Sequence, residues 1–326
     1  MKNVYKLTIV LLTCIGASAQ DTATNSYTQT NLVSDISGMA AVTDPHLVNP
    51  WGLSRAATSP WWVSDEGTGL STLYNGAGAI QGLVVTIPPA KTGTGSPTGT
   101  VFDGSGFAFA TLDGTIQSWS GGSSAVIKVN NSASGAAYTG LTLATKGSET
   151  VLYAANSAGG VEAYTTAFAR VKLPKGAFKD QNIPAGYTPY GIQAVGKDIY
   201  VTFSWGPGNG GYVDVFTPAG KLLRSLAQGW FNEPWGIAQA PKGFGRFQDA
   251  ILVGNVGSGQ IAAFKASTGD FLGFLDDASK KPIAIPGLWA LFFGGGNTSS
   301  GPATSLYFAA GIDNYLHGLF GTITAN

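Results

Sequence analysis

Residues 49–54 (NPWGLS), followed by residues 61–69 (WWVSDEGTG) and 71–76 (STLYNG), decide the fold class of this chain. They predict three short strands, because apolar and aromatic runs alternate with the turn residues Gly, Asn and Asp. A closely similar series begins at residues 233–238 (EPWGIA) and continues through residues 251–264. Two such copies, far apart in one chain, indicate a repeated structural unit.

The unit recurs six times at corresponding positions, which are Gly52, Gly99, Gly140, Gly191, Gly236 and Ala290. Successive positions are 41 to 54 residues apart, as expected for four-stranded blades with variable loops. The last unit, from residue 287, has only three strands, whereas residues 27–34 (YTQTNLVS) form a strand without a neighbour. We therefore predict an all-β, six-bladed β-propeller, closed by this N-terminal strand, which completes the last blade. A β-sandwich pair is the alternative fold.

Composition supports a turn-rich β protein. The chain has 326 residues with Gly 47 and only 11% charged residues, so tight turns are many and charged surface is sparse. Repeated all-β folds often use this length as one domain, and we predict a single domain over residues 27–326. Within it we expect residues 35–48 to be a loop and residues 83–88 to be the fourth strand of the first blade.

The N-terminus predicts export. Residues 1–19 have the organisation of a signal peptide, with a positive start, an apolar run and a small-residue cleavage site before Gln20. Residues 20–26 would follow as a flexible leader, and the mature protein would be secreted or periplasmic. The only cysteine, Cys14, lies within the signal, so the mature chain would lack disulfides. Lipoprotein processing at Cys14 is the alternative.

Charge and hydropathy exclude some partners. Lys+Arg 18 balances Asp+Glu 18, so no overall positive field favours nucleic acid or an anionic membrane. No stretch is long and apolar enough to span a bilayer as a helix. We expect a monomer that binds a carbohydrate, a peptide or a protein.

Three motifs carry a resemblance to a known family. The NPWG motif at 49–52, the series at 61–76 and HGLFG at 317–321 resemble an uncharacterised family of exported bacterial β-propellers, and the repeats are distantly similar to NHL propellers. The resemblance implies fold and export but no activity. Some members of that family end in a PEP-CTERM sorting segment. This sequence ends at Asn326 without one, so we do not expect anchoring by that route.

Aromatic residues occupy the same place in four of the six units. In a propeller the innermost strand of each blade lines the axis, so equivalent positions converge there. An aromatic ring about the axis could stack on a sugar or another apolar ligand, and the alternative is that the rings only pack blade against blade. The candidate ligand-binding residues are Trp51, Tyr190, Trp235 and Trp289.

Oxygen-bearing side chains also recur near blade ends. Asp65, Asn156 and Asn255 end the second strands of their units, and Glu233 stands just before an inner strand. Together they could hold Ca²⁺, which takes six to eight oxygen ligands. The alternative is that Asp and Asn at strand ends bond to their own turns.

Candidates for acid–base chemistry are few. His46 and His317 are the only histidines, and His317 or Glu66 is the candidate general base. The sequence has neither a Gly-Xaa-Ser-Xaa-Gly elbow nor a His-Glu-Xaa-Xaa-His motif, which are the local signatures of serine hydrolases and zinc peptidases. We therefore predict an exported scaffold that binds through its axial face, with a Ca²⁺-assisted, lactonase-like hydrolase or lyase at the central channel as the alternative.

Overall fold

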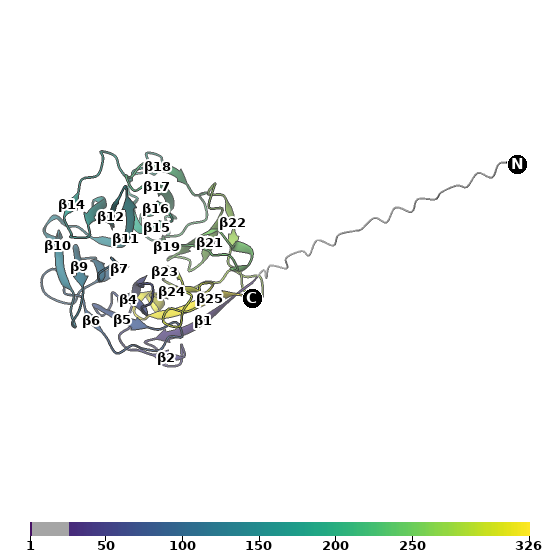
Figure 1. Ribbon diagram of the computed structural model, residues 1–326, viewed down its shortest axis with the longest axis horizontal. Coiled ribbons are helices and arrows are strands. Elements are labelled where there is room, and N and C mark those ends of the chain that lie inside the picture. The colour runs from purple at the N-terminus through teal and green to yellow at the C-terminus, as the bar shows by residue number, and fades with distance from the viewer. Residues whose placement is uncertain (2–25) are drawn as a thin grey trace.

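The computed structural model describes Met1 and residues 26–326. The predicted signal peptide beyond Met1, Cys14 and all but the last residue of the predicted leader lie outside the described residues. Among the described residues, six β-sheets form a ring around a central axis (Figure 1). The predicted six-bladed β-propeller is confirmed.

The first three complete blades follow the chain from its inner to its outer strand. Their strands are β3 (Pro50–Ser54), β4 (Trp61–Asp65), β5 (Leu70–Tyr74) and β6 (Val85–Thr86); β7 (Pro97–Phe102), β8 (Phe107–Thr111), β9 (Thr115–Trp119) and β10 (Val126–Asn130); and β11 (Tyr138–Lys146), β12 (Glu149–Asn156), β13 (Gly160–Thr165) and β14 (Arg170–Val171). A short 3₁₀ turn, η1 (Ser132–Ser134), lies between the second and third blades. The first blade's outer strand is shorter than the predicted range 83–88, because Pro88 and Pro89 cannot continue the ladder.

Blades four to six follow the same order. Their strands are β15 (Thr188–Val195), β16 (Asp198–Ser204), β17 (Tyr212–Phe216) and β18 (Leu222–Ser225); β19 (Pro234–Gln239), β20 (Ile251–Asn255), β21 (Ile261–Phe264) and β22 (Phe271–Phe274); and β23 (Leu288–Phe293), β24 (Leu306–Ala310) and β25 (Leu319–Ala325). The 3₁₀ turn η2 (Gly245–Phe247) lies within blade five, and the one-turn segment α1 (Ile312–Tyr315) within blade six.

The ring closes as the sequence predicts. β1 (Tyr27–Ser34) pairs antiparallel with β25, with Val33 opposite Phe320, so the start of the described chain completes the sheet that its end leaves open. Tyr27 fixes this strand further, because its hydroxyl donates to the Phe244 carbonyl of blade five at 3.2 Å. Closure covers strand edges that would otherwise remain free to pair with other chains.

One strand was not predicted. The loop expected over residues 35–48 contains β2 (Val42–Thr43), which pairs in parallel with Val33 and Ser34. β1 would otherwise present an unpaired outer edge, and β2 covers part of it. The last sheet therefore has five strands, while each of the other five described sheets has four.

The glycine of the repeat has a steric cause. A Cβ on Gly52 would lie 2.3 Å from the Thr98 carbonyl oxygen, and a Cβ on Gly236 would lie 2.3 Å from that of Trp289. Each oxygen belongs to the neighbouring inner strand, β7 for Thr98 and β23 for Trp289. Only glycine permits this approach, so the repeat glycines of five blades let their inner strands pack closely against the next one around the axis.

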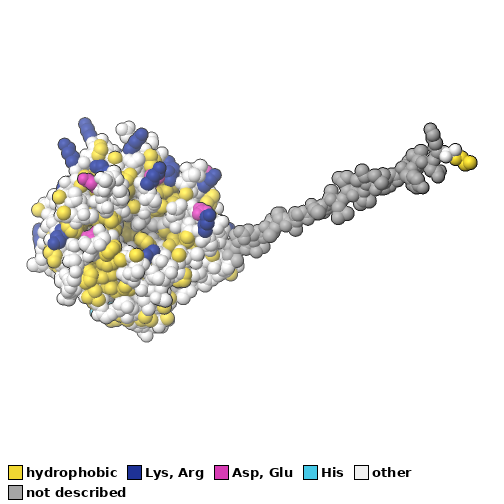
Figure 2. All heavy atoms as spheres, in the orientation of Figure 1, with side chains coloured by type: hydrophobic (Ala, Val, Ile, Leu, Met, Phe, Trp, Pro, Cys, Tyr) yellow, Lys and Arg dark blue, Asp and Glu magenta, His cyan; other side chains and the backbone are white. Residues whose placement is uncertain are grey.

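No helix among the described residues has the length and the apolar character that crossing a membrane would require. Charged side chains are sparse on the face shown in Figure 2, and most of its Lys and Arg residues lie on the half of the ring that carries β14, β18 and β22.

Candidate functional site

The axis has two ends, at which the chain places different residues. We call the face at which the inner strands begin the top face, and the opposite face, at which they turn into the second strands, the bottom face. In each inner strand the residues on either side of the repeat glycine point to the same side, because side chains two positions apart share a face of a strand. Trp51 and Leu53, around Gly52, are one example.

The four predicted aromatic residues meet at the top end of the axis. The rings of Trp51 and Trp289 stack at 3.6 Å between centroids, and Trp235 meets both edge-on at 6.2 and 6.0 Å. Tyr190 lies 5.9 Å from Trp289. The three tryptophans are only 2 to 9% exposed. This axial aromatic cluster fills the channel with its own rings, so their faces are already occupied by one another.

Hydrogen bonds hold two of the three indoles in place. The Nε1–H of Trp289 donates to Asn49 Oδ1 at 3.0 Å, and that of Trp235 donates to the Thr139 carbonyl at 2.9 Å. The Nε1–H of Trp51 is buried and has no partner among the described residues. Buried indole N–H groups usually find an acceptor. Trp51 lacks one among the described residues, and its ring contacts Trp289, Trp235 and Tyr190.

Two acidic residues lie beside the cluster in different environments. Glu66, a predicted base, accepts a hydrogen bond from Asn49 Nδ2 at 2.8 Å, and Asn49 in turn accepts the bond from Trp289. Glu66 is therefore part of the packing of the top end. Glu233 occupies the position of Asn49 in blade five, and burial raises the pKa of its carboxyl group.

His317 is oriented by an aspartate that sequence reasoning did not identify. Its Nδ1 lies 2.7 Å from Asp35 Oδ2, and Asp35 Oδ1 accepts from the Gly318 backbone N–H at 2.8 Å. Asp313 is more distant, at 4.0 Å from Nε2. The predicted pairing of the N-terminal strand with the last strand could have revealed this contact, because it places Asp35, the residue after Ser34, beside His317. His46 contacts a different aspartate, Asp44, at 3.1 Å.

A left-handed turn stands next to His317. In α1, Asp313, Asn314 and Tyr315 have φ values of 50°, 53° and 68°. Three consecutive non-glycine residues rarely adopt this conformation, which costs about 1–3 kcal/mol at a single residue and tends to occur at functional sites. The turn places the ring of Tyr315 5.6 Å from Trp289, at the mouth of the channel.

The predicted metal ligands bond mainly within their own blades. Asp65 Oδ2 accepts from the Thr72 N–H at 3.0 Å, Asn156 Oδ1 accepts from the N–H groups of Ala137 and Ala158, and Asn255 Oδ1 accepts from that of Asn232. These bonds join the end of a second strand to nearby backbone, which is the turn-forming role of such residues.

The predicted Ca²⁺ site on these four residues stays a prediction. Among residues 26–326, no three His, Cys, Asp or Glu side chains gather closely enough to hold a metal ion. No hydrogen bond or ion pair of these residues joins any two of Asp65, Asn156, Asn255 and Glu233. Burial raises the pKa of Asp65 well above its ordinary value, and its Oδ1 is buried without a partner among the described residues.

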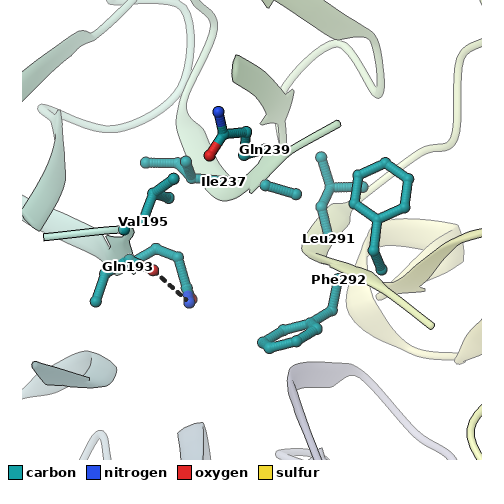
Figure 3. A pocket seen from close by; sticks show the side chains of 10 residues that line it. Gln193, Val195, Ile237, Gln239, Leu291 and Phe292 are labelled. Atoms are coloured by element: carbon teal, nitrogen blue, oxygen red, sulfur yellow. Dashed lines mark hydrogen bonds between the residues drawn. The ribbon is translucent and has the colours of Figure 1, made fainter. Parts of the chain in front are cut away.

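The bottom end of the axis is open instead of filled. A cavity of about 250 Å³ lies between the ends of β15, β19 and β23. Gln193 and Val195 form one side, Leu291 and Phe292 the other, and Ile237 lies between them (Figure 3). The lining has no ionisable side chain; its polar side chains are the amides of Gln193 and Gln239.

A narrower space continues from this cavity toward the axial aromatic cluster. Every inner strand contributes to its lining through the residue after the repeat position. Trp235 is the member of the axial aromatic cluster that reaches it. The six residues, each directly after a repeat glycine or its equivalent, are Leu53, Thr100, Leu141, Ile192, Ile237 and Leu291. Sequence reasoning missed this ring, although its position in the repeat could have revealed it.

Comparisons with known proteins agree on the fold. No protein-family model matches the chain. It is 26% identical over 325 residues to an uncharacterised protein of Acanthamoeba polyphaga mimivirus, across 90% of this chain and 78% of that protein. A second uncharacterised protein of the same virus is 27% identical over 327 residues, across 90% and 84% of the two chains.

Similar solved structures include the soluble aldose sugar dehydrogenase of Escherichia coli, with a TM-score of 0.59, 11% identity and coverage of 92% of this chain and 100% of that one. A glucose dehydrogenase has a TM-score of 0.59 and 14% identity, with coverage of 92% of this chain and 100% of that one. The virginiamycin B lyase of Staphylococcus aureus has a TM-score of 0.53 and 13% identity, with coverage of 92% of this chain and 99% of that one. At these identities the likeness establishes the propeller fold alone, and the expected similarity to propeller proteins is confirmed.

Proposed function

We propose that this protein is a binding propeller that takes an uncharged ligand into the cavity at the bottom end of its axis. The observation that carries the proposal is the contrast between this open cavity and the filled top end. Three inner strands, β15, β19 and β23, supply nearly all of its walls, so regular sheet forms the lining. An apolar wall with two orienting amides is typical of ligand pockets.

The size and the chemistry of the cavity define the ligand class. Small-molecule pockets span roughly 300–1,000 Å³, so a cavity of about 250 Å³ suits a small molecule or one side chain of a peptide. A charged ligand would lose its hydration without gaining a counter-ion there. The Gln193 and Gln239 amides can each donate and accept, which suits a ligand with a hydroxyl or an amide group.

A screen with a matched pair of variants tests the proposal. Neutral glycans, neutral peptides and small alcohols should include compounds that raise the melting temperature, because a ligand that binds only the folded state stabilises it. Gln193→Trp narrows the cavity from a half-buried position and should abolish the shift. Leu316→Trp adds the same ring at an exposed site on the top face and should retain it. Retention of the full shift by Gln193→Trp would contradict the proposal.

A second candidate function is that of a hydrolase or lyase at the top end. The 2.7 Å contact between Asp35 and His317 supports it, since a carboxylate that orients an imidazole is a common arrangement for a general base. Similar folds in a virginiamycin B lyase and in sugar dehydrogenases indicate that a propeller can host such chemistry. Turnover of lactone or ester substrates that is lost in His317→Asn would support this candidate. If a chelator leaves that turnover unaffected, the reaction does not depend on a metal ion.

We further propose that the protein is exported and belongs with the bacterial propeller family that its NPWG and HGLFG motifs resemble. The organisation of residues 1–19 supports export, although the relatives found are viral and uncharacterised. Expression of the full chain in a bacterial host with mass analysis of the exported product tests this. A mature N-terminus at Gln20 is expected. An uncleaved cytoplasmic product, or lipid attached to Cys14, would contradict it.

A further inference from the structure

Glu233 is a largely buried residue whose carboxylate oxygens still reach the surface and accept no hydrogen bond from residues 26–326. Its side chain lies at the top end of the axis, the residue is only 6% exposed, and no hydrogen bond or ion pair from residues 26–326 reaches its carboxylate oxygens. Burying a carboxylate is costly unless a donor or a counter-charge compensates for lost water. A carboxylate that is largely desolvated, still reachable from the surface and without a protein donor is therefore a physical reason to expect a ligand at this position.

Blade one shows that the same position can be fully satisfied. Asn49 and Glu233 both precede a Pro-Trp-Gly sequence, and both are left-handed, with φ of 46° and 55°. The Asn49 carbonyl accepts from the Glu66 N–H, and the Glu233 carbonyl accepts from the Val256 N–H, so Val256 corresponds to Glu66. In blade one, the Asn49 amide and the Glu66 carboxylate bind each other. In blade five, the residue corresponding to Glu66 is Val256, whose side chain has no hydrogen-bonding group.

A second unpartnered oxygen lies near this carboxylate. Asn232 Oδ1 is buried and accepts no hydrogen bond among the described residues. A Cβ on Gly257 would lie 2.5 Å from Asn232 Oδ1 and 2.9 Å from Glu233 Oε2, so both acceptors approach the same point. Two adjacent acceptors, one of them negatively charged, favour a cation that carries several N–H donors.

Two tyrosine side chains lie in the neighbourhood of the carboxylate. Burial, and next the charge of Glu233, raise the pKa values of the Tyr190 and Tyr315 hydroxyls, which places Glu233 close to both side chains. Tyr190 belongs to the axial aromatic cluster. Tyr315 is 41% exposed and is held at the channel mouth by the left-handed turn of α1. Ring faces near a carboxylate add to its attraction for an organic cation.

We propose that Glu233, Asn232, Tyr190 and Tyr315 form a binding site for a primary ammonium group, such as the side chain of a lysine in a peptide. Glu233 supplies the counter-charge, Asn232 Oδ1 accepts one N–H, and the tyrosine rings contact the methylene groups next to the nitrogen. Ca²⁺ fits less well, because it requires six to eight oxygen ligands and this position offers few. The site lies on the opposite face from the bottom cavity and does not depend on it.

Titration with n-butylammonium chloride, followed by NMR of the backbone amides, tests the site. We expect saturable shifts at Gly257 and Tyr315 and none with n-butanol, which has the same alkyl chain without the charge. Glu233→Gln should weaken binding at least tenfold. Glu66→Gln, which changes the carboxylate that accepts from Asn49 in blade one, should leave the affinity within about twofold.

Further measurements keep the proposal falsifiable if Glu233→Gln does not fold. Tyr315→Leu changes an exposed residue and should weaken binding at least threefold. Calcium chloride at matched ionic strength should produce no saturable shifts at these amides. The proposal is overturned by an absence of saturable shifts in the folded wild type, by unchanged affinity in Glu233→Gln or Tyr315→Leu, or by saturation with Ca²⁺ in place of the amine.

Discussion

The two ends of the axis are built by the same six strands and differ in nearly every property. The top end is filled by stacked aromatic rings and surrounded by Glu66, Glu233 and His317, whereas the bottom end is hollow, apolar and free of ionisable lining residues. The two ends differ in the residues on either side of the repeat glycine. Residues before the repeat glycine are mostly Trp or Tyr, and those after it are Leu, Ile or Thr. The larger side chains before the repeat glycine therefore help to close the top end.

The largest expected effect is on the stability of the closed end. Trp289→Ala removes a 2% exposed ring stacked on Trp51, so it should lower the free energy of unfolding by about 3–5 kcal/mol. Phe292→Ala removes a half-buried ring from the lining of the bottom cavity and should cost less than half as much. Urea unfolding measures both. Equal losses would contradict the contrast between a packed end and an open one.

A smaller effect separates two tryptophans of the axial aromatic cluster. Trp235→Phe deletes the donor to the Thr139 carbonyl and leaves a buried acceptor unpaired, which costs about 1–3 kcal/mol. Trp51→Phe deletes an N–H group that has no partner, so it should cost less, although the loss of ring volume is the same. The difference in urea midpoint between the two variants, at equal m-value, measures the hydrogen bond. A greater loss in Trp51→Phe would refute the assignment.

The smallest expected effect is a pH dependence confined to the top end. Burial raises the pKa of Glu233 in the folded protein above its value in the unfolded chain. Stability is then highest where the carboxyl group is protonated in both states, and it falls as pH rises from the unfolded pKa through the folded pKa. Glu233→Gln should reduce this fall.

Thermal melts of wild type and Glu233→Gln between pH 4 and pH 8 measure that dependence. Gln193→Leu, at the bottom end, serves as the control, because it removes no ionisable group and should leave the pH profile unchanged. A profile of Glu233→Gln that is parallel to wild type would show that burial of this carboxylate does not affect stability.

The fold could be predicted because its signals are repeated and local. The repeat glycine, replaced by Ala290 in the last unit, recurs at blade spacing, and the unpaired strand at 27–34 matched the missing strand of the last blade. β2 was missed because two residues carry no periodic pattern, and only the free edge of β1 explains them. The convergence of Trp51, Tyr190, Trp235 and Trp289 followed from their equivalence, but their mutual stacking depends on ring sizes around the whole axis.

The chemistry of the site was harder to predict. Asp35 contacts His317 through a pairing of strands from opposite ends of the chain, which no local motif records. The bottom cavity is lined by aliphatic residues and amides, which have no catalytic signature in a sequence. Asp65, Asn156 and Asn255 share a place in the repeat, yet their bonds to nearby backbone are of the kind that turns require. The ligand-binding and catalytic assignments remain predictions.

Crystals soaked in cyclohexanol test most directly whether ligands reach the axis from the bottom. The molecule is uncharged, mainly apolar and carries one hydroxyl group, so it should occupy the cavity between Ile237 and Leu291, with its hydroxyl near Gln193. Density there, with Trp51 and Trp289 still stacked, is the expected result. An empty cavity, or density between the separated rings of Trp51 and Trp289, would contradict the account.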